Sequence, residues 1–265
     1  MKIACAGWGF RQMGMRQYFE EALALGTGFV EVNCSENVPE HLSPKATLDE
    51  AREMAELASS IGVKVVALAA GNDFTVADEA EWNRHVASVK HVIDLAQAAG
   101  AEVVRIFAGW AEELDDAVFE RAARGIREVG EYAKTKGVVL GIENHGGMTA
   151  TGESCAKLLD LVGDLSAVGL TYDPANFAYV GADPLRGLTA VGKRVTYCHL
   201  KDVRRDLDGK PEYCAFGEGE IDWPPILAGL RAFYGGYLAI EYERAEDAAD
   251  GTRRSLENLH PLLEA

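Results

Sequence analysis

An acid, an amide and an imidazole follow directly after an apolar run near the middle of the chain. The run covers residues 138–142, and the polar residues are Glu143, Asn144 and His145, with two glycines after them. This pattern is typical of a buried strand that ends in functional side chains. A lone carboxylate in a dry interior loses its hydration at a cost of many kcal/mol. We therefore expect Glu143 to meet a cation, a metal ion or water.

Three later apolar runs end in the same way, in a side chain that can bind a metal ion. They end at Asp173, His199 and Glu241, each about one strand–helix unit after the previous one. A strand-end acid often accepts only a loop amide, but four ligand-type residues at matching places favour a shared metal site. Three carboxylates and one imidazole form an oxygen-rich set that suits Mn²⁺ best, with Mg²⁺ or Co²⁺ as alternatives.

A divalent metal ion at these side chains favours proton abstraction next to a carbonyl group. A dication that binds a ketone oxygen and the neighbouring hydroxyl stabilises the enediolate left when the α-proton departs. We predict that Glu143 and Glu241 are the catalytic acid/base pair. Return of the proton gives a sugar isomerase or epimerase, acting on a small keto-sugar or keto-acid. Loss of hydroxide or carboxylate instead gives a lyase, a dehydratase or decarboxylase, and this alternative stays open.

Strand alternation adds two residues to the predicted site. Side chains two positions apart in a strand point to the same side, so His145 should follow Glu143 and Lys201 should follow His199. We predict that His145 and Lys201 bind substrate.

Two further substrate-binding residues are predicted from loops. Asn176 is either a turn residue or a hydrogen-bond donor to substrate hydroxyls, and Glu218 lies in the glycine- and acid-rich loop 217–222. Whether Arg204 and Arg205 bind an anionic group of the substrate is left open. Trp8, after the first strand, either lines the predicted substrate pocket or packs beneath it.

The elements that must position these side chains alternate along the chain. Apolar runs predict strands near residues 2–6, 29–33, 63–70, 102–107, 138–142, 168–173, 194–199 and 237–241. Helical periodicity predicts helices near residues 13–25, 47–61, 78–99, 115–136, 153–162, 184–191, 223–233 and 247–263. Thr47 and Glu50 form a capping box, and Asp222 is a predicted cap. The segment 201–222 is expected to be a polar loop.

Eight strands alternating with eight helices indicate an α/β fold, a single (β/α)8 TIM barrel. No shift in composition divides the chain, so we expect one domain over residues 1–265. A doubly wound sheet also alternates. However, the first strand–helix turn lacks the spacing of a dinucleotide fingerprint, and a nucleotide cofactor is not indicated.

Composition limits the partners. With 26 Lys and Arg against 42 Asp and Glu, the net charge of −16 repels nucleic acid and anionic membranes.

Five scattered cysteines argue against a disulfide framework, and no run is apolar enough for a membrane helix. The apolar part of the first residues is too short for a signal peptide, so we expect a first strand and a cytoplasmic location. The expected partners are a small carbohydrate or keto-acid substrate and further copies of this chain.

Five short motifs resemble those of the sugar phosphate isomerase/epimerase family, the xylose isomerase-like TIM barrels. They are I-E-N-H at Glu143, Y-D-P-A-N-F at Asp173, C-H-L-K-D at His199, the loop G-E-G-E-I-D-W, and Y-L-A-I-E at Glu241. The family includes ketose 3-epimerases, hydroxypyruvate isomerases, inosose dehydratases and dehydroshikimate dehydratases. The resemblance implies that Glu143, Asp173, His199 and Glu241 are the metal ligands. Ketose epimerases usually have a histidine where this chain has Asn176, which weakens the epimerase assignment and leaves the family intact.

Three other functions compete with this prediction. A Schiff-base aldolase would use Lys201, but nearby carboxylates raise the pKa of an amine and oppose its action as a nucleophile. Endonuclease IV shares the superfamily but needs a basic DNA-binding face and more histidines for a zinc cluster. A barrel that has lost catalysis and only binds its ligand is the last alternative.

Overall fold

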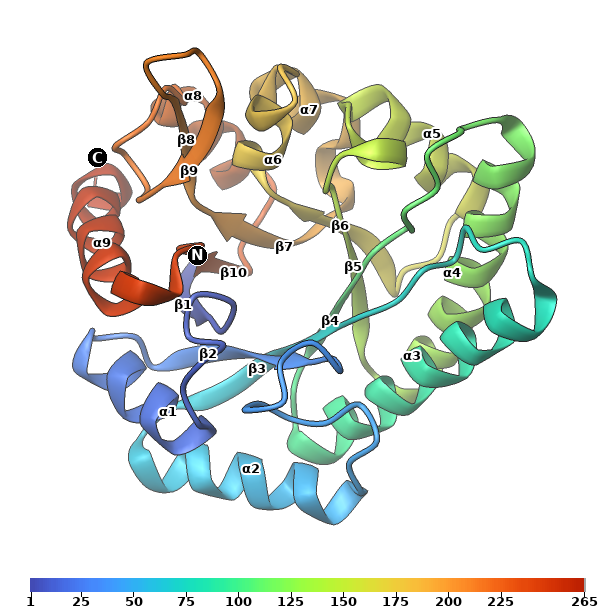
Figure 1. Ribbon diagram of the computed structural model, residues 1–265, viewed down its shortest axis with the longest axis horizontal. Helices are drawn as coiled ribbons and strands as arrows, with labels where there is room; N and C mark the ends of the chain where they lie inside the picture. Colours follow the sequence, from blue (N-terminus) through green and yellow to red (C-terminus); the bar gives the residue numbers. More distant parts are fainter. Residues whose placement is uncertain (265) are drawn as a thin grey trace.

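Short segments rich in Val, Ala and Ile form the eight parallel strands of a closed barrel (Figure 1). The computed structural model describes residues 1–264. The barrel strands are β1 (Lys2–Ala6), β2 (Phe29–Cys34), β3 (Lys64–Ala70), β4 (Val103–Ile106), β5 (Val139–Glu143), β6 (Val168–Tyr172), β7 (Val195–Leu200) and β10 (Tyr237–Ile240). From β1 to β7 each strand pairs with the next one along the chain, and β7 pairs with β10. The pairing of β1 with β10 closes the ring. The prediction of a (β/α)8 barrel is confirmed.

Alternate residues of the strands face two separate apolar layers. In β1, Ala4 and Ala6 belong to a small cluster inside the ring with Tyr197 and Ala239. Cys5, between them, belongs to the large core that lies between the strands and the helices. Because both layers are covered, the strands are apolar almost throughout, as parallel strands require.

Helices surround the ring of strands (Figure 1). Within residues 1–264 they are α1 (Met15–Ala24), α2 (Leu48–Ile61), α3 (Glu79–Ala99), α4 (Asp116–Lys136), α5 (Gly152–Val162), α6 (Pro174–Tyr179), α7 (Pro184–Val191), α8 (Trp223–Arg231) and α9 (Ala248–Glu264). The predicted capping box is present: Thr47 Oγ1 accepts from Glu50 N at 3.2 Å, and Glu50 Oε2 accepts from Thr47 N at 2.6 Å.

The expected strict alternation is wrong in two places after β6. The short helix α6 precedes α7, because Asp173 accepts a hydrogen bond from Asn176 N at 3.1 Å and Pro174 occupies the first turn. The segment 201–222 contains an antiparallel hairpin, β8 (Asp202–Arg205) and β9 (Pro211–Cys214), in place of the expected loop. The sequence did not predict these two strands because their exposed positions carry charged residues, so they lack the apolar pattern of the barrel strands.

A third correction concerns the start of α8. Asp222 occupies the N-cap position, but its side chain makes no capping hydrogen bond within residues 1–264. The other predicted elements begin and end within a few residues of the observed ones.

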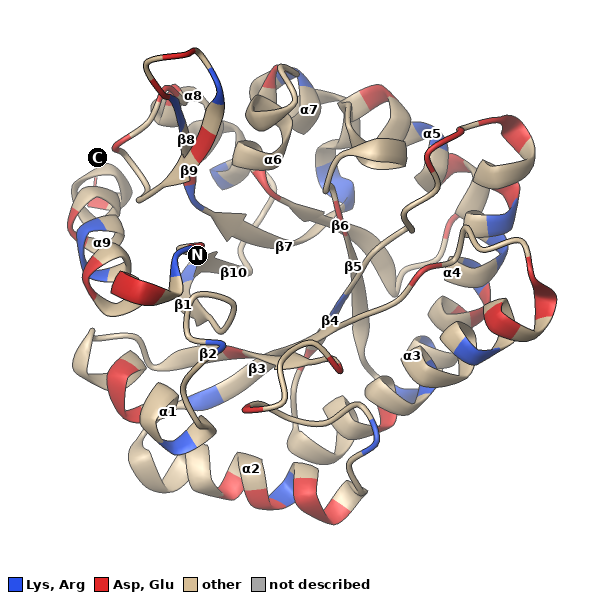
Figure 2. Cartoon of the chain, in the orientation of Figure 1, with Lys and Arg blue, Asp and Glu red and all other residues tan. Residues whose placement is uncertain are grey.

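Charges of both signs are distributed over the outer helices and loops (Figure 2). Helix α2, for example, carries Asp and Glu next to Arg, with an ion pair between Asp49 and Arg52. Among residues 1–264, no helix combines the length and the apolar character needed to cross a bilayer.

Candidate functional site

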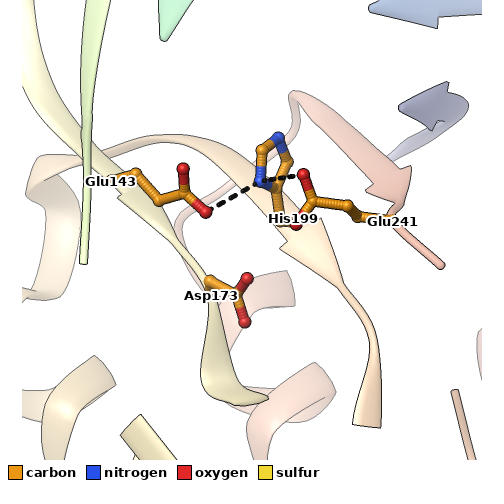
Figure 3. A group of neighbouring side chains, drawn as sticks. All are labelled: Glu143, Asp173, His199 and Glu241. Atoms are coloured by element: carbon orange, nitrogen blue, oxygen red, sulfur yellow. Dashed lines mark hydrogen bonds and ion pairs between the residues drawn. The ribbon is translucent and has the colours of Figure 1, made fainter. Parts of the chain in front are cut away.

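Four strands deliver the four predicted ligand residues to one place at the carboxyl end of the barrel. Glu143 is the last residue of β5, Asp173 follows β6, His199 lies in β7 and Glu241 follows β10. One ligand-type atom from each side chain lies within 4.8 Å of the others, and all four side chains point into a common space (Figure 3). All four residues are buried.

A close approach between β5 and β6 helps to bring Glu143 and Asp173 together. Gly141 pairs with Gly169, and a Cβ atom on Gly141 would lie only 2.1 Å from Thr171 Oγ1. Asn144 then ties the two strand ends together, because its amide donates to Asp173 O at 2.7 Å and accepts from Asp173 N at 2.8 Å. The backbone around the two acids is therefore fixed before any ligand arrives.

His199 presents its Nδ1 atom to the carboxylates. This atom lies 3.2 Å from Glu143 Oε1 and 3.4 Å from Glu241 Oε1 (Figure 3). On the other side of the ring, Nε2 lies 2.9 Å from Oε2 of Glu31, a buried residue of β2. When Nε2 carries the proton, Glu31 accepts it in a hydrogen bond and leaves the Nδ1 lone pair free for a metal ion.

Sequence reasoning missed Glu31. Its signal was a charged residue inside an otherwise apolar strand, between Val30 and Val32. Such a residue must find a polar partner inside the barrel, because an unpaired buried carboxylate is costly.

Lys201 is surrounded by three carboxylates. Its Nζ atom lies 2.6 Å from Glu241 Oε2, 2.7 Å from Glu243 Oε1 and 2.9 Å from Asp173 Oδ2. Burial alone would lower the pKa of Lys201, but the three carboxylates outweigh it and hold the pKa well above its usual value. A permanently charged ammonium is a poor nucleophile, which argues against a Schiff-base mechanism.

Arg105 of β4 is the second buried base beside Lys201, and sequence reasoning missed it. Its Nε atom lies 3.3 Å from Glu143 Oε2, Nη1 donates to Ala70 O at 3.0 Å, and the guanidinium lies over the Phe107 ring. Burial would raise the pKa of Glu143, but His199 and Arg105 outweigh it and lower the pKa to about 2.

The other predicted substrate-binding residues separate into two groups. Asn176 donates to Glu143 Oε1 at 3.2 Å and accepts from the Tyr213 hydroxyl at 2.7 Å, so it lies at the cluster. His145 and Trp8 line a cavity that lies over the cluster. Glu218 lies outside this cavity and pairs with Arg254 of α9 at 2.7 Å. The structure gives the prediction for Glu218 no support.

Arg204 and Arg205 form the exposed second half of strand β8. Arg204 pairs with Glu212 at 2.6 Å, and Arg205 lies 3.8 Å from Glu220. Both guanidinium groups already face acids of the same insertion.

The cluster fits a divalent cation by the chemistry of its donors. Three carboxylate oxygens and one imidazole nitrogen converge, and the acids around them outnumber the buried bases Arg105 and Lys201. Asp173 Oδ2 makes no hydrogen bond within residues 1–264, and its contact with Lys201 is an ion pair only. Burial raises the pKa of Asp173 to about 6, although Lys201 acts in the opposite direction. The neighbouring carboxylates Glu143 and Glu241 also raise this pKa, because they repel the charge of Asp173. A bound cation would offset this repulsion between the acids.

A cavity of about 280 Å³ lies over the cluster. Besides the acids Glu143, Glu241 and Glu243 and the bases Arg105 and Lys201, its walls are largely aromatic and amide side chains. This size and lining suit a small polar ligand.

Comparison with known proteins agrees with this geometry. The family model described as xylose isomerase-like TIM barrel matches residues 19–262. An inosose dehydratase from Clostridium perfringens is 33% identical over 147 residues, which cover 49% of each chain. This chain therefore spans about half the length of the curated relatives it matches.

Two solved structures superpose over the whole chain. A structure of L-ribulose 3-epimerase has a TM-score of 0.82 at 18% identity and covers 100% of this chain and 95% of its own. A structure of the IOLI protein with a zinc atom bound has a TM-score of 0.83 at 18% identity and covers 100% and 98%. At these identities the likeness establishes the fold alone.

Proposed function

The chain belongs to the xylose isomerase-like TIM barrel family, and from this premise we propose that it is a divalent-metal-dependent sugar isomerase or epimerase. The reaction would move a proton next to the carbonyl of a small keto-sugar or keto-acid through an enediolate. One observation carries the proposal: two glutamates, an aspartate and a histidine converge within 4.8 Å beneath a cavity of about 280 Å³.

Glu143, Asp173, His199 and Glu241 would hold the metal ion, with Mn²⁺ as the proposed ion and Mg²⁺ or Co²⁺ as alternatives. When bound, the ion would polarise the substrate carbonyl and stabilise the negative charge that develops on its oxygen. The name of the inosose dehydratase relative supports a carbohydrate-like substrate.

The two glutamates are the proposed acid/base pair. Glu143 and Glu241 approach His199 Nδ1 from different sides (Figure 3), so a substrate between them would meet a carboxylate on two faces. One carboxylate would take the α-proton. The proton would then return to the neighbouring carbon from that same, now protonated, group, or the opposite carboxylate, after taking up a proton from solvent, would protonate the other face. Burial removes bulk water from both groups and fixes their positions, which offsets their weak basicity.

Surrounding residues would keep each glutamate in its required state. Arg105 and Asn176 contact the two oxygens of Glu143 and keep it ionised and oriented. Lys201 does the same for Glu241 and places an ammonium group on the cavity wall. That ammonium group can donate a hydrogen bond to a substrate oxygen. His145, also on the wall, is the proposed contact for a more distant hydroxyl.

A lyase is the second candidate. The name of the relative, inosose dehydratase, favours it, and so does the charged Lys201 beside Glu241, which could donate a hydrogen bond to a departing hydroxide and stabilise its negative charge. The first step, removal of the α-proton, is common to both candidates. A small carbohydrate ligand, a homo-oligomeric state and a cytoplasmic location complete the proposal.

The test is incorporation of deuterium from heavy water into a panel of keto-sugars and keto-acids with added Mn²⁺, followed by NMR. We expect exchange at the carbon next to the carbonyl, and we expect Glu143→Gln and Glu241→Gln each to slow it by roughly 100-fold or more. Glu218→Gln, which removes an acid outside the cavity, should exchange at the parent rate. The same spectra separate an isomer from a dehydrated product.

Exchange at the parent rate in both glutamine variants would show that the acid/base assignment is wrong. Metal binding without exchange of any substrate in the panel would favour a binding protein.

A further inference from the structure

A second, larger cavity adjoins the one over the carboxylate cluster. The first measures about 280 Å³ and the second, towards helix α3, about 710 Å³. Five residues line both cavities: Ser35, Asn37, Gly71, Phe107 and Trp110. These residues therefore form a junction between two compartments.

One of the five residues of the junction is a glycine, Gly71, whose missing side chain leaves room beside Ser35. A Cβ atom on Gly71 would lie 3.1 Å from the Cβ of Ser35 and would meet no other heavy atom within 4 Å. Glycine thus keeps the passage between the loops after β2 and β3 as wide as these backbones allow.

Two aromatic residues of the junction, Phe107 and Trp110, form an aromatic platform. Trp110 is 49% exposed, its ring centroid lies 4.7 Å from that of Phe107, and it meets His145 edge-on at 5.4 Å. A large indole held by its neighbours and open to solvent offers a flat apolar face with negative potential. The C–H face of a sugar ring is complementary to such a surface.

The charges around both cavities disfavour an anionic ligand. Three acids and the bases Arg105 and Lys201 line the first cavity. Two further buried acids lie behind this wall, Glu31 at His199 and Asp173 at Lys201, so a dication would still leave an excess of negative charge. The acids Glu36, Asp73 and Glu81 outnumber the bases Lys45 and Arg84 in the lining of the second cavity. Glu36 pairs with Lys45 at 2.6 Å, and Asp73 Oδ1 accepts from Thr75 N and Trp110 N. Ser88, on helix α3, adds an uncharged hydroxyl to its lining. Hydroxyl-rich neutral ligands suit both compartments.

We infer that the ligand of this barrel is an uncharged keto-sugar joined by a glycosidic bond to a second sugar ring. The keto-sugar ring occupies the cavity over Glu143 and Glu241. The second ring lies on Phe107 and Trp110 and extends into the cavity beside α3. The assignment of the first ring rests on the proposed function, whereas the assignment of the second rests on the shared walls and the aromatic platform.

Sugar binding tests this inference without any reaction. Saturation-transfer NMR and calorimetry on the Mg²⁺-loaded protein would compare glucose with cellobiose and maltose, and galactose with lactose. We expect at least one disaccharide to bind about tenfold more tightly than its monosaccharide, the gain expected from stacking one further ring.

Two variants block only the second cavity. Ser88→Trp and Arg84→Trp both change residues that line it, on helix α3, and each should abolish the disaccharide preference while leaving monosaccharide affinity at the parent value. Ser59→Trp, on the exposed face of α2, is the matched control and should keep the preference. Equal binding of all mono- and disaccharides by the parent, or an undiminished preference in both α3 variants, would overturn the inference. Proton exchange on single-ring keto-sugars tests the reaction separately, so the two proposals can fail independently.

Discussion

His199 is held between carboxylates at both ring nitrogens. Glu143 and Glu241 face Nδ1, and Glu31 faces Nε2 at 2.9 Å. Histidine ligands of metal ions usually donate their second N–H group to a carboxylate or carbonyl, which fixes the tautomer and raises the basicity of the ligating nitrogen. At this scale Glu31 acts through His199 as a positioning residue.

We therefore expect Glu31→Gln to weaken metal binding by roughly 10- to 100-fold, the usual effect of losing such a partner. Calorimetry with Mn²⁺ measures the affinity, and the visible spectrum of the Co²⁺-loaded protein reports the ligand geometry. Neither measurement depends on activity.

Glu102→Gln is the control for the loss of one negative charge. Glu102 bonds Lys64 and Tyr237 at the opposite end of the barrel, so its variant should bind metal as the parent does. Parent-like affinity and an unchanged Co²⁺ spectrum in Glu31→Gln would contradict the positioning role.

At the scale of elements, one aspartate organises the insertion between β7 and α8. Asp202 is fully buried and accepts four hydrogen bonds, from Val203 N at 2.8 Å, Gly217 N at 3.1 Å, Ile221 N at 3.3 Å and the Trp223 indole at 2.7 Å. It thus ties both ends of the segment that carries the hairpin β8–β9. The hairpin in turn brings Tyr213 to Asn176.

Asp202→Asn should lower the free energy of unfolding by roughly 2–4 kcal/mol, because the amide NH₂ would face N–H donors and leave them unsatisfied. Urea denaturation measures this change. The matched control is Asp222→Asn in the same insertion, where the aspartate makes no capping bond within residues 1–264 and the expected change is within about 0.5 kcal/mol. Equal stability of the two variants would argue against the organising role of Asp202.

At the scale of the whole molecule, ring closure couples every strand to the cluster. The β1–β10 pairing joins the two ends of the barrel, and the acids of the site come from β2, β5, β6, β10 and the segments after them. We predict that residues 1–265 unfold as one domain, and that the metal ion stabilises the entire ring by binding only the folded state.

Calorimetry should therefore show one thermal transition that EDTA shifts downward. At a metal concentration roughly 100 times Kd, metal binding contributes about 2.7 kcal/mol, which corresponds to a shift of several degrees. The double variant Glu143→Gln/Glu241→Gln should lose this response. Two resolved transitions, or a response to EDTA that persists in the double variant, would contradict the prediction.

Local patterns in the sequence determined much of this protein. The eight apolar runs, the helical periodicities and the Thr47 capping box depend on neighbouring residues, so they predicted the barrel. Because the carboxyl ends of parallel strands share one rim, the strand-end residues Glu143, Asp173, His199 and Glu241 could be grouped before the structure was known.

Only the tertiary structure decided which other residues join them. Glu31 and Arg105 lie within strands β2 and β4, and a strand pattern does not say which of its two faces the closed ring turns inward. Tyr213 arrives on a hairpin held by Asp202, and the second cavity exists only where loops from different strands meet at Trp110. These contacts join residues far apart in the chain, and their geometry is set by barrel closure and side-chain packing, which act after the local patterns have formed.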